Sequence, residues 1–509
     1  MLGLRQLARH IPGRLLGRLL GQLRRLPGHL LGPGRARGPA TDYDLVIVGM
    51  GSGGLVAAKF AASLGLHVAA VERDRVGGDC LWTGCVPSKA LLAAAKVAHQ
   101  MRTADRFGLP PADPDIDLAK VWDRIRSVQQ DIATTDDDPE RYRAMGVDVV
   151  FGEARLTGPH AVEVGGRTLT TRFTLLCTGS TPAAPPIAGL SEAGFLTSEN
   201  LFTLTDPPRS CMVIGGGPIA VEMAQALSLL GVRVQLLEKE DRLLGRDEPE
   251  LADLLATRLR ADGVSIDVGV DIERVAANSQ RKVLEGKHEG RTRRWEAAEI
   301  LVAAGREPTL DGLGLDALGV ITGSRGVQVD DRLQTSVPSV YAAGDVAGRF
   351  LFTHSAGYEA ALAVRNMFFP ASSKATELVP WCTFTDPELA HAGLTVAEAR
   401  ERYGDDVEVA RADLAHSDRA RADDTTEGRV LLVTAKGRLV GAHILAPTAG
   451  EMIHEPALAI QQQLKLRDLA GLIHVYPTLT TSTNLLAADA AYATARTFSW
   501  LVHRGRPHH

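Results

Sequence analysis

Apolar runs that break into glycine-rich turns occur at two places along the chain. The first is Asp44-Leu-Val-Ile-Val-Gly-Met-Gly-Ser-Gly-Gly54, which leads into an alanine-rich stretch and then into His67-Val-Ala-Ala-Val-Glu72. This pattern predicts a buried strand, a tight turn, a helix and a second strand that ends in an acid. The run Cys211-Met-Val-Ile-Gly-Gly-Gly-Pro-Ile-Ala220, which continues to Val232-Arg-Val-Gln-Leu-Leu-Glu238, predicts the same unit again.

The first of these turns has the spacing of a dinucleotide-binding site. Gly49, Gly51 and Gly54 read G-x-G-x-x-G. The first glycine permits the tight turn, the second lets the backbone approach a pyrophosphate, and the third lets helix and sheet pack closely. Glu72 would then accept hydrogen bonds from the adenosine ribose.

The second turn repeats this arrangement with alanine at the third position. Gly215, Gly217 and Ala220 occupy the corresponding places, and Glu238 follows Gly215 by the same 23 residues that separate the first turn from its acid. One such motif is weak evidence, but two copies in matching context favour two bound dinucleotides. A flavin that is reduced by a nicotinamide uses such a pair.

A cysteine pair follows directly on the first unit, in Gly77-Gly-Asp-Cys-Leu-Trp-Thr-Gly-Cys-Val-Pro-Ser-Lys89. Pro87 can open a helix, which would place Cys85 at the N-terminus of that helix. The helix dipole and Lys89 would stabilise the Cys85 thiolate, the form that reacts. Cys80 and Cys85 therefore predict a redox-active disulfide. The other cysteines lie in or beside apolar segments and are expected to be inert core residues: Cys177, Cys211 and Cys382.

Composition supports an α/β protein of roughly three domains. The chain has 509 residues, of which 45% are hydrophobic and only 5% aromatic, so its cores rest on aliphatic residues. Five cysteines are too few for a secreted disulfide scaffold, which favours a reducing compartment. The chain has no uninterrupted apolar run of about 18 residues, so we predict no transmembrane helix.

Residues 1–40 form a basic leader with eight Arg and no Lys, Asp or Glu. Because the whole chain carries a net charge of −5, residues 41–509 carry −13, which gives no electrostatic case for nucleic-acid binding. Apolar residues at helical spacing between the arginines favour a helix on an anionic membrane surface. A poorly ordered extension and a mitochondrial transit peptide are the alternatives. We therefore expect a cytoplasmic protein, with peripheral membrane contact or mitochondrial import left open.

At these residues the chain resembles the pyridine nucleotide-disulfide oxidoreductases, which include dihydrolipoamide dehydrogenase, glutathione reductase and mercuric reductase. Further family landmarks follow in order, so that the resemblance spans about residues 42–490. These landmarks are Cys177-Thr-Gly-Ser-Thr-Pro182, Ala304-Gly-Arg-Glu-Pro308, Tyr341-Ala-Ala-Gly-Asp-Val346 and Phe352-Thr-His354.

The resemblance implies roles for individual residues. Cys85 would be the thiol that donates charge to the flavin, and Cys80 the thiol that faces the acceptor. Lys89 and Glu222 would form a pair near flavin N5, where hydride arrives. The resemblance also implies a set of FAD-binding residues: Thr178, Gly179, Ser180, Gly344, Asp345 and His354, together with Lys89. Gly305 would lie near the NAD.

The family architecture implies two Rossmann-like domains and a C-terminal α+β interface domain that forms a homodimer. In such a dimer, the C-terminal segment of each subunit completes the active site of the other. The predicted limits are 1–40 for the leader, 41–190 and 306–375 for the FAD domain, 191–305 for the NAD domain, 376–490 for the interface domain and 491–509 for the tail.

The chain departs from the family near its C-terminus. Where dihydrolipoamide dehydrogenase and glutathione reductase carry a basic His and a Glu, this chain has Tyr476 and Thr481, with His474 two positions early. In an extended segment, His474 and Tyr476 could share one face. It also lacks the terminal cysteine pair of mercuric reductase. We therefore expect an FAD-dependent NADH oxidoreductase that is similar to mercuric reductase and has no resident metal. Its small-molecule acceptor would be a soft metal ion, a quinone or a small disulfide. NADPH would be the weaker donor, and Tyr476 or His474 could move protons. A dihydrolipoamide dehydrogenase with an altered base is the runner-up, and a redox-sensing or complex-tethering flavoprotein is the alternative of another class.

Overall fold

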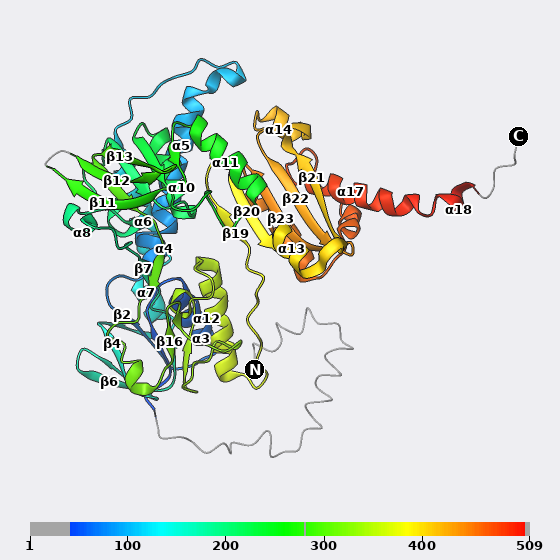
Figure 1. The fold of residues 1–509 in the computed structure, drawn as a ribbon. Helices are drawn as coiled ribbons and strands as arrows, with labels where there is room; N and C mark the ends of the chain where they lie inside the picture. The colour runs from blue at the N-terminus through cyan, green and yellow to red at the C-terminus, as the bar shows by residue number, and fades with distance from the viewer. Residues whose placement is uncertain (1–40, 279–280, 504–509) are drawn as a thin grey trace, which may run out of the picture. The chain divides into compact units, whose positions relative to one another are not determined.

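A parallel β-sheet carries the first glycine-rich unit in the computed structural model, which describes residues 41–278 and 281–503 (Figure 1). The elements of this part are β1 (Tyr43–Val48), α3 (Ser52–Ser63), β2 (Val68–Glu72), α4 (Gly78–Trp82), α5 (Cys85–Arg102), α6 (Leu118–Ala133), α7 (Pro139–Ala144), β3 (Val147–Phe151), β4 (Ala154–Gly158), β5 (Ala161–Val164), β6 (Arg167–Leu176) and β7 (Ser180–Pro182). After an excursion into the second unit, the chain returns with β15 (Arg306–Pro308), β18 (Val340–Ala342) and α12 (Thr353–Phe368). The seven-stranded sheet has the order β3-β2-β1-β6-β5-β4, with β18 beside β6.

The strands at the centre of this sheet are buried on both faces. Helices α3 and α12 pack together on one face, where small alanines allow close contact with β1 and β2. On the other face, β4, β5 and the segment around Leu313 and Leu315 complete a second aliphatic core. The predicted order of strand, turn, helix and strand is therefore confirmed, and this order brings the glycine turn to the carboxyl end of β1. The leader lies outside the described residues.

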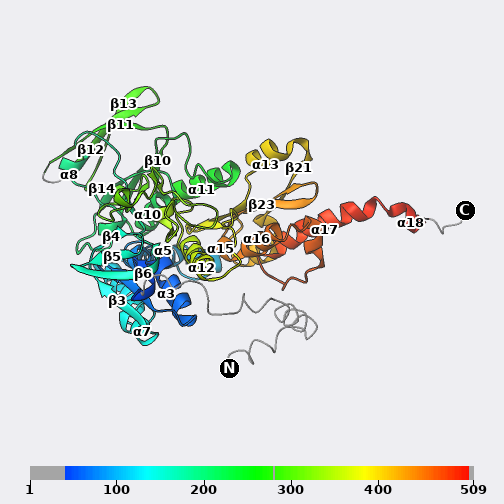
Figure 2. The ribbon, with the colours of Figure 1, turned by 90° about the horizontal axis from the view of Figure 1, so that it is seen from below.

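The second unit repeats the arrangement around a four-stranded parallel sheet of order β10-β9-β8-β14. Its elements are α8 (Leu190–Ala193), α9 (Ser198–Leu201), β8 (Ser210–Ile214), α10 (Pro218–Leu229), β9 (Arg233–Leu237), α11 (Pro249–Ala261), β10 (Ser265–Asp267), β11 (Asp271–Ala277), β12 (Lys282–His288), β13 (Arg291–Ala297) and β14 (Glu299–Val302). The antiparallel strands β11, β12 and β13 form a separate three-stranded sheet at the edge of this unit (Figure 2).

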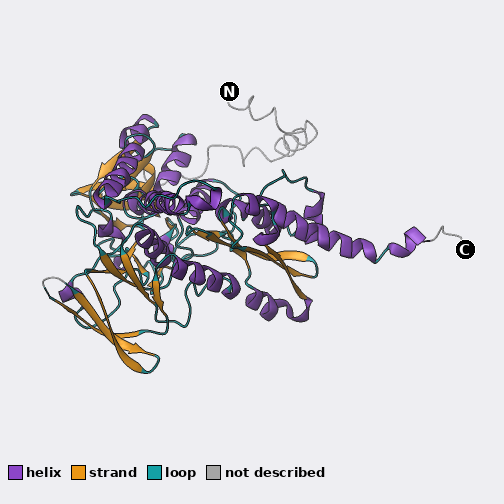
Figure 3. Cartoon of the chain, turned by 90° about the horizontal axis from the view of Figure 1, so that it is seen from above, coloured by secondary structure: helices purple, strands orange, loops and turns teal. Residues whose placement is uncertain are grey.

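The C-terminal part is built on a five-stranded antiparallel sheet of order β19-β20-β23-β22-β21 (Figure 3). Its elements are β19 (Trp381–Thr383), β20 (Glu388–Gly393), α13 (Val396–Tyr403), β21 (Val407–Asp413), α14 (Asp418–Ala422), β22 (Arg429–Ala435), β23 (Arg438–Ala446), α15 (Ala449–Met452), α16 (His454–Gln461), α17 (Thr481–Arg496) and α18 (Ser499–His503). Leu389, Leu431 and Leu445 on one face join the core of the second unit. The other face packs on α15, α16 and α17.

This arrangement of two parallel sheets and one antiparallel sheet confirms the predicted α/β fold class with a C-terminal α+β part. The predicted domain limits stay predictions. Among the described helices, none combines the length and the apolar character that crossing a bilayer requires.

Candidate active site

Most of the predicted site residues line one cavity of about 2190 Å³. Six of them are not part of this lining: Gly54, Gly215, Ala220, Glu238, Gly305 and Tyr476. All three parts of the chain line it, with the first glycine turn, the cysteine pair, the start of α10, the segment from Gly344 to His354, and Trp381. Pockets for drug-sized ligands usually measure about 300–1,000 Å³. The cavity is therefore large enough for ligands of dinucleotide size.

The first glycine turn is closed to any side chain. Gly49 has a φ of +98°, and a Cβ atom there would lie 2.4 Å from the carbonyl oxygen of Cys177. Glu72, at the end of β2, accepts hydrogen bonds from the backbone N–H groups of Met50 (2.8 Å) and Asp74 (2.9 Å). The turn and the acid are thus held together beside the cavity, which fits an adenosine pyrophosphate.

The second glycine turn shows the same constraint. Gly215 has a φ of +117°, and a Cβ atom there would lie 2.5 Å from the carbonyl oxygen of Ala303. Ala220, at the third motif position, is completely buried on α10. Glu238 accepts a hydrogen bond from the backbone N–H of Glu240 (2.7 Å), and its carboxylate lies against Gly216.

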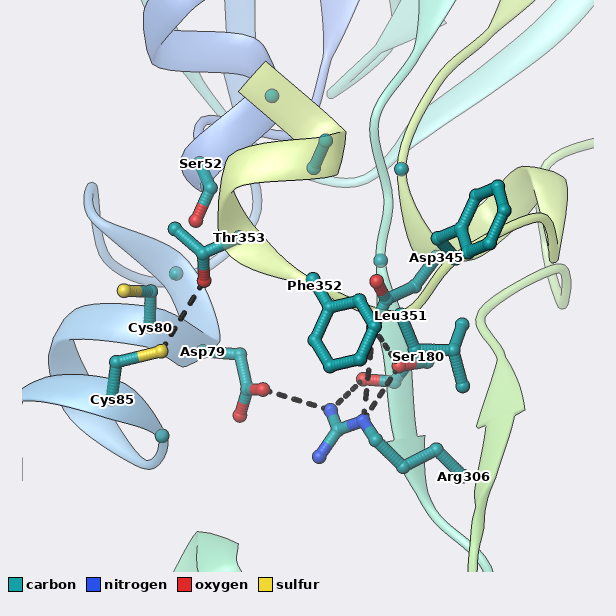
Figure 4. Close-up of a pocket in the computed structure, with 18 of the residues that line it drawn as sticks. Ser52, Asp79, Cys80, Cys85, Ser180, Arg306, Asp345, Leu351, Phe352 and Thr353 are labelled. Atoms are coloured by element: carbon teal, nitrogen blue, oxygen red, sulfur yellow. Dashed lines mark hydrogen bonds and ion pairs between the residues drawn. The ribbon is translucent and has the colours of Figure 1, made fainter. Parts of the chain in front are cut away.

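Four polar side chains connect helix α4, which carries Cys80, to β7, β15 and the turn that follows β18 (Figure 4). The Ser180 hydroxyl donates to Asp345 (2.5 Å), and Arg306 donates to Ser180 (2.8 Å) and pairs with Asp79 (2.9 Å). Burial raises the pKa of Asp345, although Ser180 and Arg306 oppose the rise. Asp345 is therefore a half-buried acceptor on the cavity wall, suited to a hydroxyl-bearing ligand chain such as a ribityl group.

Other predicted FAD-binding residues flank this network. Thr178 donates its hydroxyl hydrogen to the carbonyl of Thr309 (2.8 Å), and Gly179 lies on the cavity wall beside it. The backbone N–H of Gly344 donates to the buried carboxylate of Glu359 (2.9 Å). The ring of His354 is tied through Nε2 to the carbonyl of Pro380 (2.8 Å), and this contact orients the ring at the cavity.

The two thiols of the cysteine motif share the cavity with Thr353 (Figure 4). Cys85 is the first residue of α5, and its Sγ lies 3.3 Å from the Thr353 hydroxyl. A hydrogen bond from Cys80, helped by Thr353 and the charge of Lys89, lowers the pKa of Cys85 to about 6. The bond to Cys85, together with burial, raises the pKa of Cys80. The sequence predicted Cys85 at a helix N-terminus, and α5 indeed begins there, with Pro87 at its third position.

The charge-transfer absorbance of the reduced protein is expected to titrate with Cys85. A thiol whose pKa is lowered to about 6 is ionised above that pH, so the band should be strong above about pH 7 and lost below about pH 5. Thr353→Ala should shift the midpoint to higher pH, whereas Thr353→Ser should keep it in place. Anaerobic absorbance titrations of the two-electron-reduced protein measure this midpoint. A midpoint that stays near 9 would show that the surroundings of Cys85 do not lower the pKa of its thiol.

An ion pair between the first and the second unit also lines the cavity. Lys89 on α5 and Glu222 on α10 are joined by an ion pair of 2.8 Å, as the resemblance implies. The second carboxylate oxygen of Glu222 accepts the backbone N–H of Phe384 (2.9 Å), and the Lys89 ammonium lies 4.4 Å from the centre of the Phe384 ring. Glu222 is 4% exposed, so its charge is held in one place.

The remaining cysteines differ in their surroundings. Cys177 and Cys211 are buried, and burial raises the pKa of both thiols, that of Cys211 to about 12. Cys382 is half-buried and lines the cavity, although burial raises its pKa too. The prediction that Cys382 is a core residue therefore needs correction, because its strand forms part of the cavity wall. Because its pKa is raised, the Cys382 thiol stays protonated at neutral pH and is unreactive, as predicted.

In the part of the chain that the structure describes, no residue after His454 lines the cavity. Tyr476 is 68% exposed, and its hydroxyl donates to Asp418 (2.8 Å). His474 instead points inward, with Nε2 3.0 Å from Glu455 and Nδ1 3.1 Å from the carbonyl of Leu472. The sequence suggested that His474 and Tyr476 could share one face, but the structure separates them.

Three residues near the thiols were not assigned a role from the sequence: Asp79, Arg306 and Thr353. Arg306 and Thr353 belong to quoted family landmarks, which was the only available signal. Their partners lie hundreds of positions away, so spacing alone could not reveal these contacts. Among the described residues, no cluster of three or more metal-binding side chains occurs.

Comparison with known proteins identifies what the chain is similar to. A family model for pyridine nucleotide-disulphide oxidoreductases matches residues 43–360, and the dimerisation-domain model of that family matches 379–487. A mercuric reductase of Bacillus cereus is 35% identical over 86% of this chain and 70% of its own length. A dihydrolipoyl dehydrogenase of Chlorobaculum tepidum is 34% identical over 89% of this chain and 97% of its own length.

Solved structures give a similar result. The HOCl-induced flavoprotein disulfide reductase RclA of Escherichia coli has a TM-score of 0.78 and 26% identity, covering 88% of this chain and 99% of RclA. A Cu(II) complex of RclA matches with the same TM-score, identity and coverage.

Proposed function

Since the chain belongs to the pyridine nucleotide-disulphide oxidoreductase family, we propose that it is an NADH-dependent enzyme that reduces a soft metal ion. Members of this family are enzymes that bind FAD and use NAD(P)H, and the dimerisation domain supports a homodimer. The first glycine turn, Glu72, Ser180 and Asp345 are the residues that would hold FAD. When bound, FAD passes electrons from the nicotinamide to the disulfide.

The side chains around the cavity divide the work. Lys89 and Glu222 would fix charge where the nicotinamide meets the flavin. The Cys85 thiolate would face the flavin, and Cys80 would face the acceptor. When the two thiols return to a disulfide they release two electrons and two protons, so that two Cu(II) ions would each take up one electron.

The observation that carries this proposal is the state of the C-terminal segment. Oxidising a dithiol requires a group that accepts its proton near neutral pH. Tyr476 is a protonated donor, and both ring nitrogens of His474 face acceptors. A metal ion, unlike a dithiol substrate, brings no thiol proton of its own that such a group would have to accept. The mercuric reductase relative and the Cu(II) complex of RclA support the same choice of acceptor.

A panel of acceptors tests the proposal. The purified yellow protein would be supplied with NADH and, in turn, with Cu(II), Hg(II), a quinone, a small disulfide and lipoamide, while NADH absorbance is followed. We expect the fastest oxidation with a soft metal ion. Faster turnover with the quinone or the disulfide would overturn the metal proposal, although the enzyme class would stand.

The runner-up is a dihydrolipoamide dehydrogenase with an altered base, because dihydrolipoyl dehydrogenases are among the relatives. One of them, from Thermus scotoductus, is 36% identical over 86% of this chain. Rapid NADH formation from dihydrolipoamide would favour it. A redox-sensing or complex-tethering role would be favoured by negligible NADH oxidation with every acceptor of the panel.

NADH is expected to be the preferred donor, with a kcat/KM above that of NADPH. The carboxylate of Glu238 would bond the ribose hydroxyls and repel a 2'-phosphate. Lys239 and Arg242 reduce this repulsion in part, although the guanidinium of Arg242 is oriented by the carbonyls of Gly245 (2.6 Å) and Asp247 (3.1 Å). Glu238→Ala should lower the ratio of kcat/KM with NADH to kcat/KM with NADPH. Glu240→Ala is the matched control and should leave this ratio unchanged. Steady-state kinetics with both donors decides the matter, and a wild-type preference for NADPH would contradict it.

We also propose that residues 1–40 are dispensable for the chemistry and provide any membrane contact. The described first strand begins at Tyr43, so a variant that starts at Thr41 should retain FAD and full turnover. It should lose binding to anionic vesicles, which co-sedimentation measures for both forms. Loss of flavin on truncation would show that the leader belongs to the fold.

A further inference from the structure

The last two helices, α17 and α18, lead away from the C-terminal sheet (red in Figure 1). The buried residues of α17 all lie in its first two turns: Ser482, Thr483, Leu486 and Ala487. The dimerisation-domain model of the family ends at residue 487 as well. Among the described side chains from 488 to 501, none is buried. Residues 488–503, which we call the C-terminal arm, therefore add no buried side chain to the core of their own chain.

The composition of the C-terminal arm is typical of a protein interface. Its large apolar side chains are each more than half exposed: Tyr492, Phe498, Trp500 and Leu501. Asp489 and Arg496 are its charged residues at neutral pH. Aromatic residues are enriched and charged residues depleted at the centre of protein interfaces. Helix α18 has only 5 residues, which is too short for a stable helix alone in water, so the arm needs a surface to pack on.

The C-terminal arm continues an exposed apolar face of the dimerisation domain. Leu485 and Tyr492 are exposed on α17 and lie two helical turns apart, so they share one side of the helix. The side-chain amide of Asn484 donates to the carbonyl of Leu472 (3.2 Å) and ties α17 to the segment before it. Further exposed apolar residues lie in that segment and on α16: Leu458, Leu472, Ile473 and Val475. Apolar side chains therefore run from the dimerisation domain into the arm.

We propose that the C-terminal arm packs on a second copy of this chain and extends the homodimer interface. The proposal rests on the homodimer that the dimerisation domain supports, and it is independent of the acceptor that the enzyme reduces. In a twofold dimer the contact occurs twice, because both subunits contribute the same side chains. A membrane surface is a less suitable cover. A helix that binds one carries a polar face rich in Lys and Arg, whereas α17 and α18 carry one Asp and one Arg.

The test compares three full-length, FAD-loaded proteins: the wild type, an arm variant and a control variant. The arm variant replaces three exposed apolar residues by a polar residue that still favours helix: Tyr492→Gln, Phe498→Gln and Leu501→Gln. The control variant makes the same change at three similarly exposed residues outside the C-terminal part: Phe151→Gln, Ile321→Gln and Phe369→Gln. Mixing dimers that carry donor and acceptor dyes measures the rate of subunit exchange. Hydrogen exchange measures the protection of the backbone amides of residues 488–503.

We expect subunits of the arm variant to exchange at least about 100-fold faster than those of the wild type. A few buried aromatic side chains carry most of the affinity of an interface, and the loss of affinity appears mainly in the dissociation rate. The control variant should exchange at the wild-type rate. The amides of residues 488–503 should be protected in the wild-type dimer and unprotected in the arm variant.

Equal exchange rates in the three proteins, or unprotected arm amides in the wild-type dimer, would overturn the arm contact. A monomeric wild type would overturn it together with the homodimer. Weaker binding of the arm variant to anionic vesicles, with subunit exchange unchanged, would assign the arm to a membrane surface instead. NADH-dependent acceptor reduction is measured separately. Its failure would refute the proposed function, whereas slow exchange and protected arm amides would still support the arm contact.

Discussion

Replacing Cys85 by serine is expected to abolish both the long-wavelength charge-transfer band and NADH-dependent acceptor reduction, the latter by about 100-fold or more. Cys85 begins α5, contacts Thr353 and has its pKa lowered to about 6 by Cys80, Thr353 and Lys89. It is therefore largely a thiolate at neutral pH when reduced. A serine hydroxyl cannot form the disulfide and does not ionise at that pH.

Two further variants make this test specific. Cys382→Ser alters a thiol that lines the same cavity but stays protonated, so the band and turnover should persist. Cys80→Ser prevents the disulfide while leaving the Cys85 thiolate, so the band should appear without added reductant. These spectra are recorded anaerobically during NADH titration. Ordinary flavin bleaching in the wild type, with no long-wavelength intermediate, would refute the assignment of the disulfide.

Turnover of dihydrolipoamide is expected to be low, and Tyr476→His should raise it. A base matched to neutral pH contributes a factor of about 100 to 10,000. The hydrogen bond to Asp418 raises the pKa of Tyr476 above the ordinary value of 10, so its hydroxyl is protonated at pH 7 and acts as a donor. An imidazole, with a pKa of about 6.5, could accept the thiol proton there.

Tyr476→Phe is the matched control for this substitution, because it removes the hydroxyl without supplying a base. It should leave dihydrolipoamide turnover low, and so should His474→Gln, since both ring nitrogens of His474 already face acceptors. Adding Thr481→Glu to Tyr476→His should raise turnover further by orienting the imidazole. The rate of NAD reduction across pH 6–9 measures these effects. Robust wild-type turnover with a rate-controlling pKa near neutral would favour the runner-up.

The network of Arg306, Asp79, Ser180 and Asp345 has a consequence for coupling between the cofactor and the thiols. Asp79 directly precedes Cys80, and Asp345 is the residue expected to hold the FAD ribityl chain. Arg306, whose side chain is 11% exposed, connects the two through Ser180. Binding of FAD would therefore also fix helix α4, which carries Cys80, the thiol expected to face the acceptor.

The sequence by itself determined the features whose chemistry is local. Gly49 and Gly215 must be glycine because their turns have positive φ and a carbonyl where a Cβ would lie, so the motif spacing was sufficient to predict both units. The same holds for Cys80 and Cys85, since their spacing and the start of helix α5 at Cys85 are encoded within a few residues. Periodicity likewise predicted the strand, turn, helix and strand order around each turn.

Only the tertiary structure decided which distant groups meet. His474 is held by Glu455 from α16, and Tyr476 is turned to Asp418, although the sequence placed both on one extended segment. His391 and His443 became neighbours through the register of β20 and β23. Such pairings depend on strand register and on packing between sheets, which are set by the burial of whole faces and leave no mark in the local spacing of residues.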